Sequence, residues 1–144
     1  MQLSEQEILR RQKSEDIIKL GINPYPSRIE LPGERVTVEK ARGSLGGNFV
    51  VAGRIWSLRI HGGLVFADLG DSTGRMQLLI HKKKMGENFK LIPLFDAGDF
   101  IAVQGTVITS KTGELTIDVD NFQLLSKSLR PIPSDWYGLS DIEE

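Results

Sequence analysis

The sequence contains no cysteine among its 144 residues, and it also lacks a surplus of positive charge. The absence of cysteine excludes disulfides, thiolate zinc sites and a cysteine nucleophile. The formal net charge is −1, whereas proteins that hold nucleic acid mainly by neutralising phosphates are usually strongly basic. Any recognition of nucleic acid must therefore depend on stacking against bases and on hydrogen bonds to base edges.

Long apolar runs and a targeting segment are missing as well. The chain begins MQLSEQEILRRQKSED, which is too polar for a signal peptide, and no apolar run approaches the roughly 20 residues of a membrane helix. The two histidines, His61 and His81, have no acidic residues nearby at metal-binding spacing. No Ser/His/Asp arrangement is evident either. We therefore expect a cytoplasmic protein without a membrane partner, a metal site or catalytic residues in these 144 residues.

What the chain does contain is a series of short segments in which apolar and polar residues alternate, the pattern of half-buried strands. The segment 81–95 differs because its apolar residues recur at helical spacing. Glycines mark tight turns at Gly62 and Gly113. Five strands with a helix between the third and fourth predict an all-β OB-fold, a five-stranded Greek-key barrel. The predicted strands are 49–60, 64–69, 75–80, 98–109 and 113–125.

The regions on either side of this barrel have a different character. Residues 1–47 begin with a predicted helix, in which Ser4 and Glu7 have the spacing of a capping box, and continue as an extended, proline-containing strap. The charged faces of the helix are either solvated or in contact with a phosphate backbone. The barrel itself is predicted for 48–126. Residues 127–144 contain an aromatic pair but no element to pack against it, so we interpret them as a linker into an absent domain.

The alternation also predicts which polar side chains share the outer face of the sheet. Alternation predicts six inward residues, which are Val65, Ala67 and Leu69 in 64–69 and Met76, Leu78 and Ile80 in 76–81. Phe66 and Gln77 then point outward, and Glu114 does so at the start of the last strand. An aromatic ring, an amide and a carboxylate together can stack on one base and hydrogen-bond the edge of another, as in the recognition of single-stranded RNA.

The residues alone leave an ordinary structural interpretation open for each of these side chains. Phe66 can cap the open end of the barrel, Gln77 can be a plain exposed strand residue, and Glu114 can be a turn residue after Gly113. Arg54 can pair with an internal carboxylate. Packing and loop positions are the simplest interpretation of Trp56 and His61, and a solvated helix end is the simplest interpretation of the lysines at 82–84.

A set of ordered motifs then connects the chain to a known family. The sequence resembles the N-terminal anticodon-binding domain of bacterial-type class II lysyl-tRNA synthetases over essentially its whole length. The motifs are GINPYP at 21–26, GRI at 53–55, FADL at 66–69, GRMQL at 74–78, KTGEL at 111–115, LLSKSLRPIP at 124–133 and GLSDIEE at 138–144.

The resemblance implies a role for each candidate site residue. At the position of Phe66 the family stacks a phenylalanine on the central U of the anticodon, and at the position of Gln77 a glutamine hydrogen-bonds the same U. A glutamate at the position of Glu114 contacts a neighbouring anticodon base. Arg54 and Arg59 match basic positions that contact bases or phosphates. The chain departs from the family pattern where Leu58 and Gly63 replace residues that are often basic.

The resemblance also implies the setting of this domain. The partner would be the anticodon loop of tRNA-Lys, and the full enzyme would be a homodimeric lysine–tRNA ligase that uses ATP and Mg²⁺ in an absent catalytic domain. The 144 residues by themselves would bind RNA without catalysis. Two alternatives remain: the corresponding domain of an aspartyl- or asparaginyl-tRNA synthetase, and a stand-alone OB protein that binds single strands without base preference or mediates protein contacts.

Overall fold

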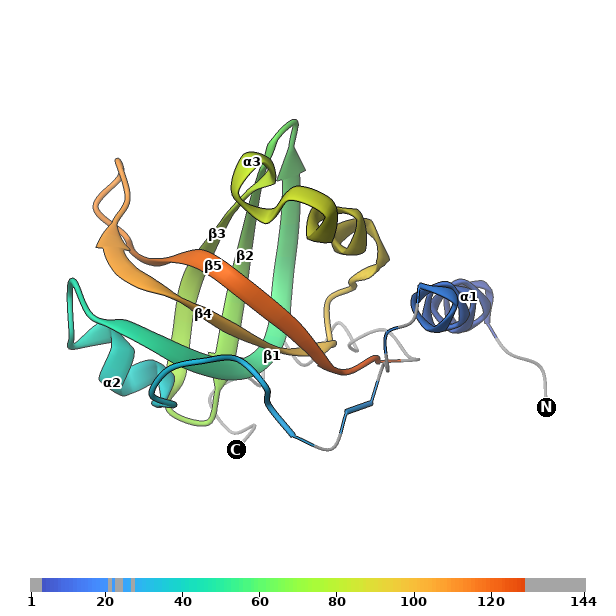
Figure 1. Cartoon of the computed structure of the whole chain (residues 1–144), viewed down its shortest axis with the longest axis horizontal. Coiled ribbons are helices and arrows are strands. Elements are labelled where there is room, and N and C mark those ends of the chain that lie inside the picture. Colours follow the sequence, from blue (N-terminus) through green and yellow to red (C-terminus); the bar gives the residue numbers. More distant parts are fainter. Residues whose placement is uncertain (1–3, 21, 23–24, 27, 129–144) are drawn as a thin grey trace.

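The computed structural model describes residues 4–20, 22, 25–26 and 28–128. Its central feature is a closed barrel of five strands in the order β1-β2-β3-β5-β4 (Figure 1). This confirms the predicted OB-fold. The strands are β1 (Asn48–His61), β2 (Leu64–Asp71), β3 (Gly74–His81), β4 (Phe100–Thr109) and β5 (Leu115–Ser126). Much of the predicted linker, including Trp136 and Tyr137, lies outside the described residues, as do Gly21, Asn23 and Pro24 of the strap.

The long strand β1 allows the sheet to curl into a barrel. Its first half, from Asn48 to Arg54, pairs with β4, and the part from Arg54 to His61 pairs with β2. The register shifts between Ile55 and Ser57, and such a bulge increases the local bend and twist of a strand. The barrel closes where β3 and β5 run parallel. Closure therefore brings two strands together that are far apart in the sequence.

The barrel interior is filled by the apolar residues that alternation predicted to point inward. All six such residues of β2 and β3 are at most 3% exposed. Burying a Val, Leu, Ile or Met side chain contributes about 1.5–3 kcal/mol. The predicted inward and outward faces of these strands are therefore confirmed. The six residues are Val65, Ala67, Leu69, Met76, Leu78 and Ile80.

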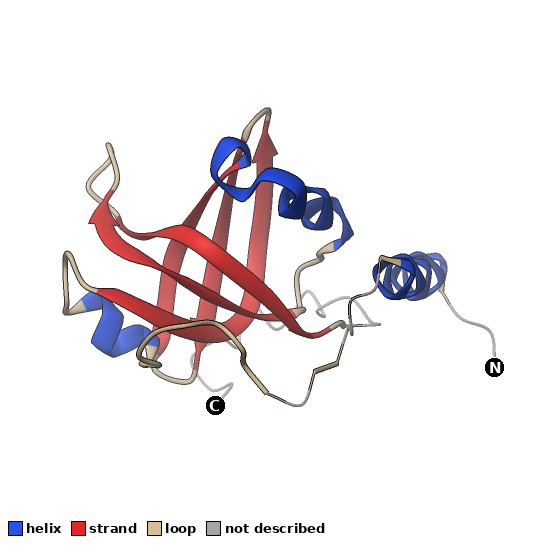
Figure 2. Cartoon of the chain, viewed as in Figure 1, coloured by secondary structure: helices blue, strands red, loops and turns tan. Residues whose placement is uncertain are grey.

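The helical segment between β3 and β4 is present, but only its first turn is an α-helix. After α3 (Lys82–Met85) the chain continues as the 3₁₀ helix η1 (Gly86–Leu94), which contains Pro93. Gly86 has a φ of +58°, which interrupts α-helical geometry, and a proline inside the segment removes a backbone donor. Figure 2 shows α3 and η1 together across one end of the barrel. Met85 and Ile92 of this segment are buried there.

The N-terminal helix α1 (Glu5–Lys19) begins with the predicted capping box, because the Ser4 and Glu7 side chains each accept from the other's backbone N–H. The helix is anchored to the loop that follows η1. Arg10 donates to the carbonyl of Ala97 at 3.0 Å, and Lys13 contacts Asp96 at 2.8 Å. Two of its basic side chains therefore stabilise the fold of this domain.

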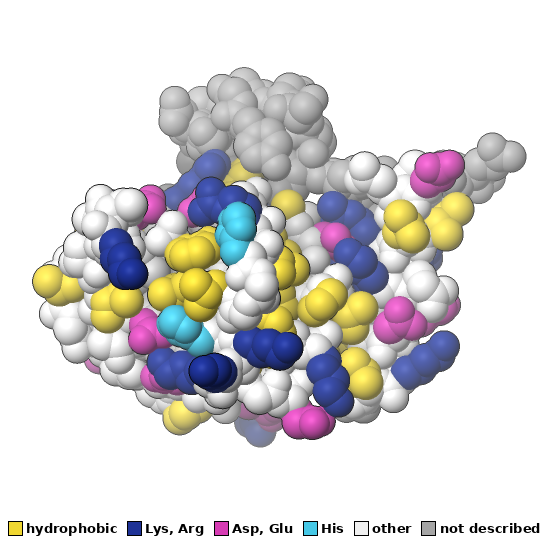
Figure 3. All heavy atoms as spheres, turned by 90° about the horizontal axis from the view of Figure 1, so that it is seen from above, with side chains coloured by type: hydrophobic (Ala, Val, Ile, Leu, Met, Phe, Trp, Pro, Cys, Tyr) yellow, Lys and Arg dark blue, Asp and Glu magenta, His cyan; other side chains and the backbone are white. Residues whose placement is uncertain are grey.

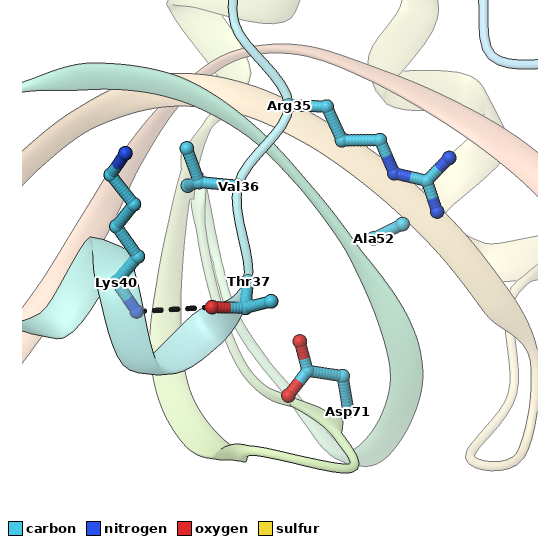
Figure 4. Close-up of a pocket in the computed structure, with 6 residues that line it drawn as sticks. All are labelled: Arg35, Val36, Thr37, Lys40, Ala52 and Asp71. Atoms are coloured by element: carbon cyan, nitrogen blue, oxygen red, sulfur yellow. Dashed lines mark hydrogen bonds between the residues drawn. The ribbon is translucent and has the colours of Figure 1, made fainter.

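A short helix, α2 (Val38–Arg42), closes the barrel end opposite α3 (Figure 1). Thr37 caps it by accepting from the Lys40 N–H at 3.2 Å, and the Asp71 carboxylate accepts from the Val38 N–H at 2.9 Å. Beside these caps is a cavity of about 500 Å³, shown in Figure 4. It is lined by Arg35, Val36, Thr37, Lys40, Ala52 and Asp71.

Candidate nucleic-acid interface

A pocket of about 730 Å³ lies on the outer face of the barrel, between the β1–β2–β3 sheet and the β4–β5 hairpin. We call it the outer-face pocket. In Figure 3 apolar side chains lie between the histidines, with Lys and Arg side chains around them. The lining residues are Arg59, His61, Leu64, Phe66, Gln77, Leu79, His81, Ile108, Thr109, Ser110, Lys111 and Thr112.

Phe66 supplies an aromatic surface in this pocket. It lies on β2 opposite Arg59 of β1 and Leu79 of β3. Its ring meets the imidazole of His61 edge to face, with ring centroids 6.3 Å apart. The side chain is half-buried in the sheet surface, so part of the ring remains accessible. A ring held on a rigid sheet is suited to stacking on a base.

Gln77 lies on the predicted face but is not an exposed strand residue. Only 7% of the residue is accessible, and its Nε2 donates to the hydroxyl of Thr116 at 3.1 Å. The interpretation of Gln77 as an ordinary exposed strand residue is therefore wrong. Alternation along the sequence predicts only which face of β3 Gln77 occupies. Its burial depends on the parallel pairing of β3 with β5, which places Thr116 directly beside Gln77. The amide is thus a fixed polar group in a largely apolar pocket.

Glu114 does not line the pocket. It is exposed in the hairpin before β5, where its N–H donates to the Ser110 hydroxyl at 3.1 Å and its carbonyl accepts from the Ser110 N–H at 2.8 Å. Ser110 itself lines the pocket. The structure therefore brings Phe66 and Gln77 together and places the Glu114 backbone at the edge of their site.

The two candidate arginines of β1 lie in different surroundings. Arg59 lines the outer-face pocket, opposite Phe66. Arg54 is not among the lining residues; its guanidinium lies over the Phe100 ring, 4.8 Å from the centroid. The two arginines are five positions apart on β1, and the register shift between Ile55 and Ser57 lies between them. Only Arg59 is therefore positioned to act together with Phe66 and Gln77.

Sequence reasoning missed several lining residues. His61, which the sequence suggested was a loop residue, contacts Phe66, and Lys111 reaches the pocket from the β4–β5 hairpin. The KTGEL motif contained the lysine, but its place in the same pocket as Phe66 follows only from the tertiary structure. None of the described residues that line the pocket is acidic. A local excess of basic groups thus exists despite the net charge of −1.

The three lysines at 82–84 differ in their contacts, because Lys84 forms ion pairs with β5. Lys84 pairs with Asp118 at 3.2 Å and with Asp120 at 2.7 Å. Burial alone would lower the pKa of Lys84, but hydrogen bonds to the two carboxylates outweigh it and raise the pKa. Lys82 and Lys83 are exposed. Lys84 therefore links α3 to β5 by ion pairs at the surface, where all three lysines are exposed.

Two negative findings apply to the described part of the chain. Residues 4–20, 22, 25–26 and 28–128 include no group of three or more His, Cys, Asp or Glu side chains arranged to hold a metal ion. Over the same ranges, none of the helices combines the length and the apolar character needed to cross a membrane.

Comparison with known proteins gives a family match. The tRNA anticodon family model, described as an OB-fold nucleic acid binding domain, matches residues 49–125. This region begins one residue into β1 and ends one residue before the end of β5. It contains all the described residues that line the outer-face pocket.

Individual relatives extend the likeness to almost the whole chain. A lysine–tRNA ligase of Clostridium perfringens (strain SM101 / Type A) is 43% identical over 143 residues, which cover 97% of this chain and 28% of that protein. The lysine–tRNA ligase 2 of Methanosarcina acetivorans is 42% identical, with 91% and 27% covered. The lysine–tRNA ligase of Synechococcus sp. (strain RCC307) is 37% identical, with 99% and 30% covered. The chain thus spans less than a third of the length of each relative.

Proposed function

This chain belongs to the family of OB-fold nucleic acid binding domains, and from that membership we propose that its outer-face pocket recognises the anticodon loop of tRNA-Lys. The single observation that carries the proposal is the pairing of an accessible aromatic ring, Phe66, with a fixed amide, Gln77, in one pocket. The relatives reported above are lysine–tRNA ligases, which favours tRNA-Lys over the tRNAs of the aspartate and asparagine enzymes.

In the proposed complex each pocket residue has one role. Phe66 stacks on a base, a contact worth about 1–3 kcal/mol that tolerates any base. Gln77 hydrogen-bonds the central U, to which its amide offers both a donor and an acceptor. Arg59 and Lys111 line the same pocket and attract phosphates. Glu114 would contact a neighbouring base from the hairpin.

Arg54 is a weaker candidate for direct contact. Its guanidinium lies against the Phe100 ring, on a part of β1 that does not line the pocket. If Arg54 meets RNA, it does so beyond the bases held between Phe66 and Gln77. We propose that it contributes to phosphate attraction along the barrel surface.

The whole protein would be a lysine–tRNA ligase that activates lysine with ATP and Mg²⁺ in a further domain, acts as a homodimer and works in the cytoplasm. Support for this comes from the names of the relatives, of which the chain spans less than a third. In this proposal the described domain contributes RNA binding, and the chemistry belongs to residues elsewhere.

The experiment is a binding measurement with an anticodon stem-loop that carries UUU and a matched loop whose central U is replaced by C. Wild type, Phe66→Ala and Gln77→Ala are compared at two salt concentrations. We expect tighter binding of UUU by the wild type, loss of that preference in Gln77→Ala, and weaker binding of both loops by Phe66→Ala. Equal binding of both loops by the wild type, with a steep salt dependence, would instead indicate a general single-strand binder.

A further inference from the structure

A buried hydroxyl connects two of the predicted base-contacting residues. Thr116 is 0% exposed and lies beside Gln77 where β3 and β5 pair in parallel. Its Oγ1 accepts a hydrogen bond from Gln77 Nε2 at 3.1 Å and donates one to the Glu114 carbonyl at 3.0 Å. The three residues therefore form a short chain of hydrogen bonds from the pocket to the hairpin.

The direction of this chain determines which way the Gln77 amide points. A hydroxyl has a single proton, and here it is donated to a carbonyl, which can only accept. Thr116 Oγ1 must then accept from the amide, so the NH₂ group of Gln77 turns toward Thr116. Reversing the amide would redirect the hydroxyl proton to Oε1 and break the Thr116–Glu114 bond. The observed orientation keeps both hydrogen bonds.

Among the described residues, no second group holds the Gln77 amide. Asp68 is the register partner of Gln77 on β2, but its carboxylate accepts from the Ser57 hydroxyl at 2.7 Å. Within residues 4–20, 22, 25–26 and 28–128, the only hydrogen bond of the Gln77 side chain is the one to Thr116. Oε1 and the second hydrogen on Nε2 thus remain for a ligand in the pocket that Gln77 lines.

We propose that Thr116 is a positioning residue that fixes the orientation of the Gln77 amide, with its acceptor and its donor at set places in the pocket. The pocket thereby binds a base with an imino N–H, such as uracil, more tightly than cytosine. The inference rests on the proposed function. Uracil offers its N3–H to an acceptor and its neighbouring carbonyl to a donor, whereas cytosine has an acceptor at N3. A fixed Oε1 facing cytosine N3 places two acceptors together, and a buried polar contact of that kind is unfavourable. An amide free to turn would accept either base.

The test compares Thr116→Val, which replaces the hydroxyl by a methyl group of similar shape, with Thr116→Ser, which keeps the hydroxyl. Each full chain is titrated with the UUU stem-loop and with the loop carrying a central C. We expect Thr116→Val to lower the ratio of the two affinities about tenfold, the order expected for one hydrogen bond, and Thr116→Ser to restore it. An equal loss for both loops in Thr116→Val, or an unchanged ratio, would overturn the inference.

Two further measurements separate the possible failures. If the wild type binds both loops equally, the proposed function fails. The positioning role alone fails if the wild type and Thr116→Val both prefer the UUU loop while Gln77→Ala does not. Should Thr116→Val not fold, Thr116→Ala serves in its place, together with side-chain amide hydrogen exchange at Gln77 in the wild type. Slow exchange relative to the exposed amide of Gln6 supports a fixed amide, and equally fast exchange overturns it.

Discussion

The imidazole of His61 meets the phenyl ring of Phe66 edge to face, with centroids 6.3 Å apart and planes inclined by 65°. Edge-to-face pairs of aromatic rings are favourable, so the contact restricts the motion of a half-buried ring. A ligand that stacks on an already ordered ring loses less conformational entropy on binding. The pocket therefore contains a preorganised aromatic platform.

Phe66→Ala is expected to weaken binding of the UUU stem-loop about 5- to 150-fold, corresponding to the loss of one stacking contact of about 1–3 kcal/mol. Phe66→Trp should keep the affinity because it retains an aromatic face. Fluorescence anisotropy with a labelled stem-loop measures both. His61→Ala is the matched control and should have a smaller effect, since it removes only the supporting contact. An unchanged affinity in a folded Phe66→Ala variant would contradict stacking.

Arg59→Gln and Arg54→Gln should differ in their effect on RNA affinity. Arg59 lines the pocket, whereas the Arg54 guanidinium lies over Phe100. Removing one phosphate contact to a single strand reduces the slope of log K against log salt by about 0.7. We expect that reduction for Arg59→Gln and a smaller one for Arg54→Gln. Titrations at four salt concentrations give the slopes, and a larger change for Arg54→Gln would refute the assignment.

Lys127→Met is expected to destabilise the domain by about 3–5 kcal/mol, because it leaves the fully buried Asp99 carboxylate without its counter-ion, while Asp96 keeps Lys13. The Lys127 side chain is 0% exposed, and its Nζ lies 2.7 Å from Asp96 Oδ2 and 2.8 Å from Asp99 Oδ2. Urea unfolding measures the loss. Lys82→Met, at an exposed lysine, is the control and should change stability by less than about 0.5 kcal/mol. Similar small changes in both variants would contradict a stabilising role for the buried cluster.

Asp71→Asn should change the pH dependence of stability. Burial alone would raise the pKa of Asp71, but hydrogen bonds from the Thr73 hydroxyl and the N–H groups of Val38, Thr73 and Gly74 outweigh it and lower the pKa. Because the folded-state pKa lies below the unfolded value of about 3.9, the ionised carboxylate stabilises the fold above that pH. This contribution is lost as the pH falls through the folded-state pKa.

The stability difference between wild type and Asp71→Asn should therefore be largest above about pH 5 and shrink toward pH 3. Thermal unfolding at a series of pH values measures it. Glu15→Gln alters an exposed carboxyl on α1 and provides the control. A difference that stays constant or grows on acidification would show that the Asp71 hydrogen bonds do not favour its ionised form.

Much of the fold followed from local patterns. The alternation of apolar and polar residues, with a period of two, identified the inward side chains of β2 and β3. Glycines marked the turns at which φ is positive, +59° at Gly62 and +86° at Gly113. Ser4 and Glu7 predicted the start of α1. These predictions held because strand alternation, tight turns and helix caps depend on residues only a few positions apart.

Tertiary structure alone decided which predicted residues act together. Gln77 and Thr116 are 39 positions apart, and only closure of the barrel through β3 and β5 places them in hydrogen-bond contact and buries the amide. The same closure places Lys111 in one pocket with Phe66, while the bulged, twisted strand β1 separates Arg54 from Arg59. Local sequence determined the face that each side chain occupies; long-range strand pairing determined its neighbours, because those contacts depend on the register between distant segments.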